Sequence, residues 1–288
     1  MPCLSDWFYL AVFSSVIASI VTTLQKSALS EKTTNPVAFA IYFQFLVFLF
    51  GLPAAILNTN HFSFSVTTFL MLMTMAFFTC VGNLIYYFAL SSIEVSEAAI
   101  VSSTASLWLL IGSSIFLNEK ITSSKIAGIA LVLFGIFFIF FDRHSFKKFG
   151  FFHILVLISA AFSSITGMFD KVLLNSFEIS TYQVLSYFLQ ALFAALMIPS
   201  SLKKLKSLAA FNQTNIIIIF AAILLNLGAF CYFSAIKHGG EISKINPILQ
   251  ASTILTILFG VIFFKENDNI FKKLSGAIIV FAGILLIK

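Results

Sequence analysis

The chain has 288 residues, of which 60% are hydrophobic and 10% are charged, and its mean hydropathy is +1.04. A soluble domain carries about 25% charged residues, and one of this length could not bury so much apolar surface. The formal net charge is +6, but the lysines stand in ones to threes between apolar runs and form no patch that would bind nucleic acid. The composition therefore indicates a multi-pass membrane protein.

Apolar segments follow one another along the chain, and each is interpreted as a membrane-spanning helix. The N-terminus lacks a basic region and a cleavage site of small residues, so we expect a retained first span and no signal peptide. The expected spans are 7–25, 36–57, 67–91, 97–117, 124–141, 150–173, 180–200, 213–236, 244–264 and 273–287. Short connections leave no soluble domain, and no alternating pattern of about ten residues suggests a barrel.

The first and second halves of the sequence resemble each other. Gly82 aligns with Gly228, and Tyr86 aligns with Tyr232. Other matched pairs are Gln25 with Asp170, Glu94 with Glu241, Ser96 with Ser243, Ser103 with Gln250, Glu119 with Glu266, Gly128 with Gly276 and Gly135 with Gly283. Because these features recur in one order at a near-constant spacing, we expect a duplication that comprises residues 1–141 and 150–288.

Each half contains five expected spans, and an odd number of crossings makes the second half enter the membrane from the opposite side. The expected fold is therefore an all-α integral membrane protein of ten helices, arranged as two inverted five-helix repeats around a central cavity. Secondary transporters of this architecture hold their substrate near the midplane, between the repeats.

Positive charges are unequal on the two sides of this expected topology. Eleven lysines and arginines lie on the side of the first, fifth, seventh and ninth connections, and six lie on the side of both termini. The positive-inside rule favours termini outside the cytoplasm.

Each half ends with an acid just before a final span that contains glycines. The segments are Asn118-Glu119-Lys120 with Gly128 and Gly135, and Lys265-Glu266-Asn267 with Gly276 and Gly283. With the duplicated five-helix plan, these segments resemble the EamA group of the drug/metabolite transporter superfamily over nearly the whole chain. The resemblance implies a central cavity that opens alternately to two faces. It also implies cytoplasmic termini, which we favour over the lysine distribution. We expect the inner (plasma) membrane of a bacterial cell.

Polar side chains of the ninth and fourth spans are candidates for substrate binding. Asn246, Gln250 and Thr253 share one face of a continuous helix. The repeat alignment adds Ser103 and Ser106, since matching faces should both point to the pseudo-axis.

Further candidates are aromatic or lie next to aromatic residues. Trp108 is on another face of the fourth span and near its middle, whereas tryptophan is usual at the membrane interfaces. The third and eighth spans offer Asn83, Tyr86, Tyr87 and Tyr232, and tyrosine combines an apolar ring with one hydroxyl, as a pocket for small metabolites requires. Core packing is the alternative for each of them.

Charges inside spans are the candidates for ion coupling, because they are costly to bury. Asp170 continues a polar stripe of Ser159, Ser163 and Thr166, and Glu97 begins the fourth span. The alternative for Asp170 is that it extends to the membrane surface beside Lys171. No acid stands clearly at the midplane, so exchange or facilitated diffusion fits as well as proton coupling.

Glycines of the final spans are assigned to helix packing. Gly128 and Gly135, like Gly276 and Gly283, are seven residues apart and share a face along which helices can approach closely. We expect no enzyme, because the histidines are scattered and no phosphate-binding loop or nucleophile elbow occurs. The odd number of cysteines, three, has no metal or redox spacing, so no cofactor or metal is expected.

These features predict a secondary transporter that moves a small organic metabolite, such as an amino acid, a nucleobase or a nucleoside, by alternating access. Its expected partners are the lipid bilayer, the substrate and, where transport is coupled, a proton or cation; nucleic acid is not expected, and a monomer should suffice. The alternative is a membrane sensor or scaffold with the same fold that does not transport.

Overall fold

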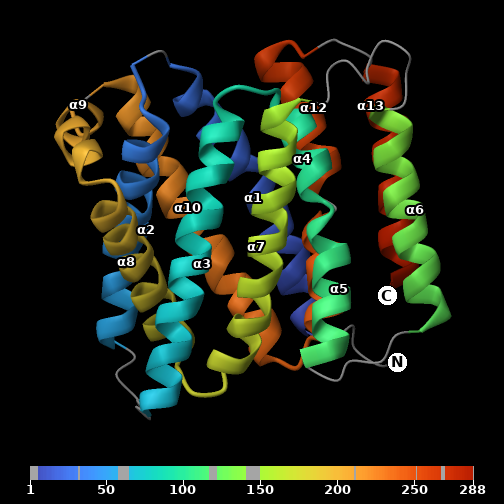
Figure 1. Ribbon diagram of the computed structural model, residues 1–288, viewed down its shortest axis with the longest axis horizontal. Coiled ribbons are helices and arrows are strands. Elements are labelled where there is room, and N and C mark those ends of the chain that lie inside the picture. Colours follow the sequence, from blue (N-terminus) through green and yellow to red (C-terminus); the bar gives the residue numbers. More distant parts are fainter. Residues whose placement is uncertain are drawn as a thin grey trace.

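A computed structural model describes residues 6–31, 33–57, 65–116, 122–140, 150–210, 212–250, 252–266 and 270–287, and all regular elements in these ranges are helices (Figure 1). The long helices are α1 (Asp6–Ser30), α2 (Pro36–Leu57), α3 (Val66–Leu90), α7 (Phe151–Leu173), α8 (Ile179–Met197) and α10 (Gln213–Lys237). The shorter ones are α4 (Val95–Ser102), α5 (Ala105–Phe116), α6 (Ser123–Phe140), α11 (Ile242–Gln250), α12 (Ser252–Phe264) and α13 (Ile270–Ile287). The 3₁₀ helix η1 (Pro199–Lys204) and helix α9 (Leu205–Leu208) connect α8 to α10.

Eight helical stretches in the described residues are long and apolar enough to cross a membrane. They are α1, α2, α3, α7, α8 and α10, with α4 and α5 counted as one stretch and α11 and α12 as another. Large apolar side chains such as Leu57, Phe116 and Phe263 are exposed on the outside, where lipid can cover them. The chain is therefore a multi-pass membrane protein, as its composition predicts.

Polar side chains fix where several helices begin. The Ser65 hydroxyl accepts a hydrogen bond from the Thr68 N–H at 3.0 Å before α3, and Asn212 accepts one from the Asn215 N–H at 2.8 Å before α10. These caps satisfy N–H groups that have no partner within the helix.

Helices from opposite halves of the sequence pack along one another. α1 lies against α10, α3 against α7, α2 against α8 and α6 against α13. Figure 1 shows α6 and α13 as a pair at one edge of the bundle. The first three pairs surround the interior, so this interior combines side chains of both halves.

Four buried glycines lie where α6 and α13 meet. A Cβ atom on Gly135 would lie 2.8 Å from the carbonyl oxygen of Gly276, and one on Gly283 would lie 2.6 Å from that of Gly128. Because the earlier glycine of one helix meets the later glycine of the other, the two helices run antiparallel. These are the glycines that the sequence assigns to helix packing.

The fourth expected span is divided into two helices, because α4 ends at Ser102 and α5 begins at Ala105. At this break the hydroxyls of Ser103 and Thr104 donate to carbonyl oxygens three residues earlier, at 2.6 and 2.7 Å. Such local bonds compete with the helical pattern. The expectation of one unbroken helix is therefore wrong for the fourth span. α11 and α12 together occupy the ninth expected span, and Ala251 between them lies outside the described residues.

Candidate functional site

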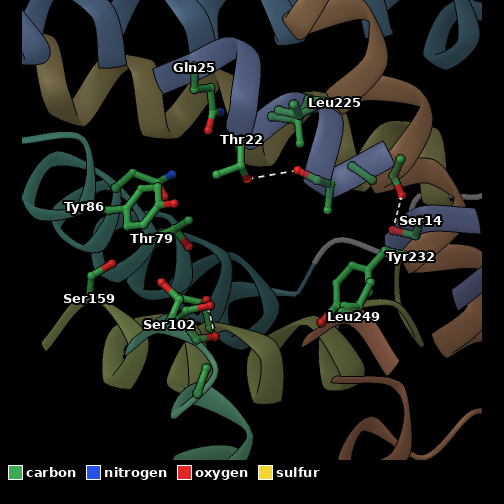
Figure 2. A pocket seen from close by; sticks show the side chains of 18 of the residues that line it. Ser14, Thr22, Gln25, Thr79, Tyr86, Ser102, Ser159, Leu225, Tyr232 and Leu249 are labelled. Atoms are coloured by element: carbon green, nitrogen blue, oxygen red, sulfur yellow. Dashed lines mark hydrogen bonds between the residues drawn. The ribbon is translucent and has the colours of Figure 1, made fainter. Parts of the chain in front are cut away.

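A cavity of about 420 Å³ lies between the helices of both halves. This volume falls within the range of about 300–1,000 Å³ that is usual for small-molecule sites. In Figure 2, Tyr86 and Tyr232 lie on opposite sides of the central space, with Gln25 above it and Ser159 below Tyr86. Ser102 and Ala105, which flank the break between α4 and α5, also line this cavity, and so do Gln250 and Ser252. Interrupted helices form the substrate sites of many membrane transporters.

The lining combines uncharged hydrogen-bonding side chains with apolar and aromatic ones. Its uncharged polar members are Ser14, Thr22, Gln25, Gln44, Thr79, Asn83, Tyr86, Tyr87, Ser102, Ser159, Ser163, Thr166, Ser186, Tyr187, Gln190, Tyr232, Gln250 and Ser252. Among the described residues that line the cavity, Asp170 alone carries a charged group. The site can therefore offer many neutral donors and acceptors but a single negative charge.

Asp170 is buried near the end of α7 and receives hydrogen bonds from two other helices. The Tyr182 hydroxyl of α8 donates to its Oδ1 at 2.5 Å, and the Tyr232 hydroxyl of α10 donates to its Oδ2 at 3.4 Å. Both donors are neutral groups. The carboxylate thus faces the cavity with its orientation fixed, instead of extending to the membrane surface beside Lys171.

Gln25 of α1, the residue that aligns with Asp170 in the repeat, also lines the cavity. Its amide donates to the Tyr87 hydroxyl at 3.2 Å. On α3, the Asn83 amide donates to the Gln190 side chain of α8 at 3.2 Å. These two bonds orient neutral amides from both halves around the cavity.

One buried polar side chain of the lining has no hydrogen-bond partner in the part of the chain that the structure describes. It is Gln44 of α2, whose amide nitrogen and oxygen are both unpaired. A buried polar group without a partner costs about 1–3 kcal/mol. Because Gln44 lines the cavity, a bound molecule could supply the missing partners.

Six of the site residues that the sequence proposes line the cavity. They are Asn83, Tyr86, Tyr87, Asp170, Tyr232 and Gln250. The polar stripe of α7 that precedes Asp170 also faces it.

The other polar candidates of the fourth and ninth spans lie outside the lining. Ser103 is used in the break after α4, and Ser106 is buried nearby without lining the cavity. Asn246 accepts a bond from Gln250 at 3.2 Å, and Thr253 donates to the Ala99 carbonyl oxygen at 3.4 Å. Of the candidates in the ninth span, Gln250 lines the cavity, whereas Thr253 bonds to α4 instead.

Trp108 and Glu97 also lie outside the lining. Trp108 of α5 is 45% exposed, on the outer surface where lipid is expected. Glu97 lies in the first turn of α4, and its carboxylate is 3.3 Å from Nε2 of His153 at the start of α7. Trp108 therefore faces away from the cavity, and Glu97, the second candidate for ion coupling, lies at a helix end beside a histidine.

Sequence reasoning missed most of the glutamines and one tyrosine of the site. Gln44 and Gln190 stand alone in apolar spans, and an isolated amide in a span is costly unless it has a partner or a role. Tyr187 is repeat-matched to Tyr42, but Tyr42 donates to Asn215 at 2.9 Å instead of lining the cavity. The isolated glutamines were therefore the better signal.

Charged contacts close one end of the bundle. Lys273 at the start of α13 contacts the Glu94 carboxylate and donates to the Ser96 hydroxyl at 2.9 Å. Glu266 accepts bonds from the N–H groups of Val95 and Ser96 at 2.8 and 3.1 Å and so caps α4. The repeat-related ion pair, Lys125 with Glu241, is longer at 3.8 Å. Glu119, the counterpart of Glu266, lies outside the described residues.

Comparisons with known proteins point to one family. The sequence profile described as "EamA-like transporter family" matches residues 6–141 and 150–288. A protein of Archaeoglobus fulgidus named "Uncharacterized transporter" is 24% identical over 285 residues, which cover 96% of this chain and 98% of that protein. A second one from the same organism, with the same name, is 26% identical over 192 residues, and the match covers 66% of each chain. A solved crystal structure aligns with a TM-score of 0.69 at 14% identity over 95% of this chain and 97% of its own, which supports the fold alone.

Proposed function

Because this chain belongs to the EamA-like transporter family, we propose that it is a secondary transporter that moves a small organic metabolite by alternating access. The observation that carries the proposal is the cavity of about 420 Å³ that both halves of the chain line. Its mixture of neutral polar and aromatic side chains fits a polar metabolite better than a lipid tail. We place the protein in the inner membrane of a bacterial cell, acting as a monomer.

We further propose that the chain forms two inverted five-helix repeats. α6 and α13 have 18 residues each, about 27 Å of helix, and would add the ninth and tenth spans to the eight stretches described above. The antiparallel packing of α6 on α13 and the pairing of α1 with α10, α3 with α7 and α2 with α8 support this arrangement. In such a protein the halves rock against each other around the shared cavity.

Flux through the purified chain in proteoliposomes tests the proposed function. A competition screen would measure which amino acids, nucleosides, amines and cofactors reduce uptake of a labelled substrate mixture. We expect the transported compound to be recovered chemically unchanged, since the proposal includes no enzymatic step. Binding without flux would contradict the proposal and would favour a sensor or scaffold.

Two cavity residues connect the flux to this site. Tyr86→Ala and Gln250→Ala should each lower uptake about tenfold, because each removes a side chain that a substrate in the cavity would touch. Tyr9→Ala is the matched control, since Tyr9 is 58% exposed on the outside of α1. Uptake unchanged in both cavity variants, with normal yield, would exclude this cavity as the substrate site.

A further inference from the structure

We propose that the transported molecule is an organic cation with a single protonated amine, and that Asp170 binds its ammonium group. This inference rests on the proposed function, because it takes the cavity as the substrate site. It adds the class of substrate and the residue that selects it.

The charge balance of the cavity is the first argument. Asp170 has two hydroxyl donors, Tyr182 and Tyr232, and both are neutral. A buried carboxylate without a cation is costly, and neutral donors compensate only part of that cost. Among the described lining residues there is no lysine or arginine, so the neutralising charge comes from a bound proton or from the ligand, and a ligand cation can take the place of the proton.

The same composition disfavours anionic substrates. A carboxylate or phosphate group in the cavity would meet no basic side chain among the described lining residues and would be repelled by Asp170. The hydration free energy that this group loses on leaving water would therefore not be recovered in the cavity. A zwitterion would have the same unfavourable desolvation at its anionic end.

Aromatic rings supply the second argument. Tyr86, Tyr87, Tyr187 and Tyr232 line the cavity, together with the rings of Phe43 and Phe233. The electron-rich faces of such rings attract ammonium groups, and the attraction is stronger when water is excluded. A carboxylate among tyrosines therefore suits an organic cation.

The two halves of the chain differ at the decisive position. Asp170 in the second half corresponds to Gln25 in the first half, and both residues line the cavity. Gln25 is neutral and already bonded to Tyr87. A cavity with one acid and one amide at related positions provides for one positive charge, not for two.

The neutral end of the substrate is indicated by an unpartnered side chain. Gln44 carries no charge, and its amide has no hydrogen-bond partner in the described part of the chain. An amide pairs well with a hydroxyl or amide of a ligand. We therefore infer a monocationic amine with a neutral polar group elsewhere in the molecule.

The test measures binding to the purified full-length protein by calorimetry. The probes are tyramine, phenethylamine and 5-aminopentanol, each paired with the alcohol in which a hydroxyl replaces the amine: tyrosol, 2-phenylethanol and 1,5-pentanediol. We expect at least one amine to bind about tenfold more tightly than its alcohol, since the ion pair with Asp170 is lost in the alcohol. Amines that bind no better than their alcohols would overturn the inference.

Variants assign the preference to one side chain. Asp170→Asn should abolish the preference for the amine, whereas Glu178→Gln should keep it. Glu178 is a matched control because it also carries a negative charge but pairs with Lys237 at the surface, at 3.0 Å. An amine preference that persists in folded Asp170→Asn would exclude Asp170 as the ammonium site and leave it a proton site at most. If this variant does not fold, the comparison of amine and alcohol on the unsubstituted protein decides whether the site prefers an ammonium group.

The failure of this inference differs from the failure of the proposed function. Flux of neutral metabolites without a preference for amines would support the transporter and contradict the proposal of a cationic substrate. Selective amine binding without any flux would keep the site and exclude transport.

Discussion

The carboxylate of Asp170 is oriented by hydroxyls from α8 and α10, so three helices fix one functional group. Any relative movement of α7 against these helices changes its hydrogen bonds. Gln44 of α2 is the opposite case, because nothing in the described chain binds its amide. One residue is held in place by the protein, and the other is left for a ligand.

Replacing Gln44 separates stability from function. Gln44→Leu should raise the free energy of unfolding by about 1–3 kcal/mol, because it removes an amide that is buried without a partner, and should lower uptake. Thermal unfolding in detergent and proteoliposome uptake measure the two effects.

Gln183→Leu is the matched control for this change. The Gln183 amide donates to the Asn226 carbonyl oxygen at 2.8 Å, so its loss should destabilise the protein. If Gln44→Leu were as destabilising as Gln183→Leu, the Gln44 amide would have a partner within the protein, and its assignment to substrate binding would be wrong.

Among the elements, α6 and α13 depend most directly on the absence of side chains. A Cβ atom on Gly283 would lie 2.6 Å from a backbone atom of α6. Only separation of the two helices could relieve this clash. A leucine at this position should therefore lower the folded yield, with an overpacking cost of about 1–3 kcal/mol. Fluorescence-detected size exclusion measures the yield.

Ala282→Leu is the control on the same helix. Ala282 is exposed, next to Gly283 in sequence but on another face, and should accept a leucine that meets lipid. Equal yields for both variants would mean that α6 and α13 do not pack through these glycines.

The sequence reveals spans and packing glycines because both follow from composition and period. It misses the break in the fourth span, because Ser103 and Thr104 look like ordinary polar residues of a continuous span until their hydroxyls bond to nearby carbonyl oxygens. Ser103, expected in the cavity, is therefore found at the break instead. The role of Gln44 was missed for a different reason, since only the packed helices show that its amide is unpaired.

At the scale of the whole molecule, the connection between α3 and α4 is tied to distant parts of the chain. Lys26 of α1 donates to the carbonyl oxygens of Leu90 and Ile93 at 2.9 and 2.7 Å. Glu266 and Lys273 bind the start of α4 from the other half. Movement of one half against the other has to break the contacts of Glu266 and Lys273 first.

Exchanging the charges of one ion pair tests this role. Glu94→Lys and Lys273→Glu should each destabilise the protein by about 1–3 kcal/mol and reduce uptake, since each leaves like charges in contact. The double variant should recover a large part of both the stability and the uptake, because the ion pair is restored with its charges exchanged. A double variant as impaired as the single ones would show that the contact does not couple the halves. Uptake and thermal unfolding of all three variants provide the measurement.

The contacts of Glu94, Ser96, Glu266 and Lys273 also have a kinetic consequence for the proposed transport cycle. They join the two halves at one end of the bundle, so opening this end costs the free energy of these contacts. In a cycle limited by this opening in the empty carrier, bound substrate that favours the open form would speed the step. Homoexchange would then outpace net flux.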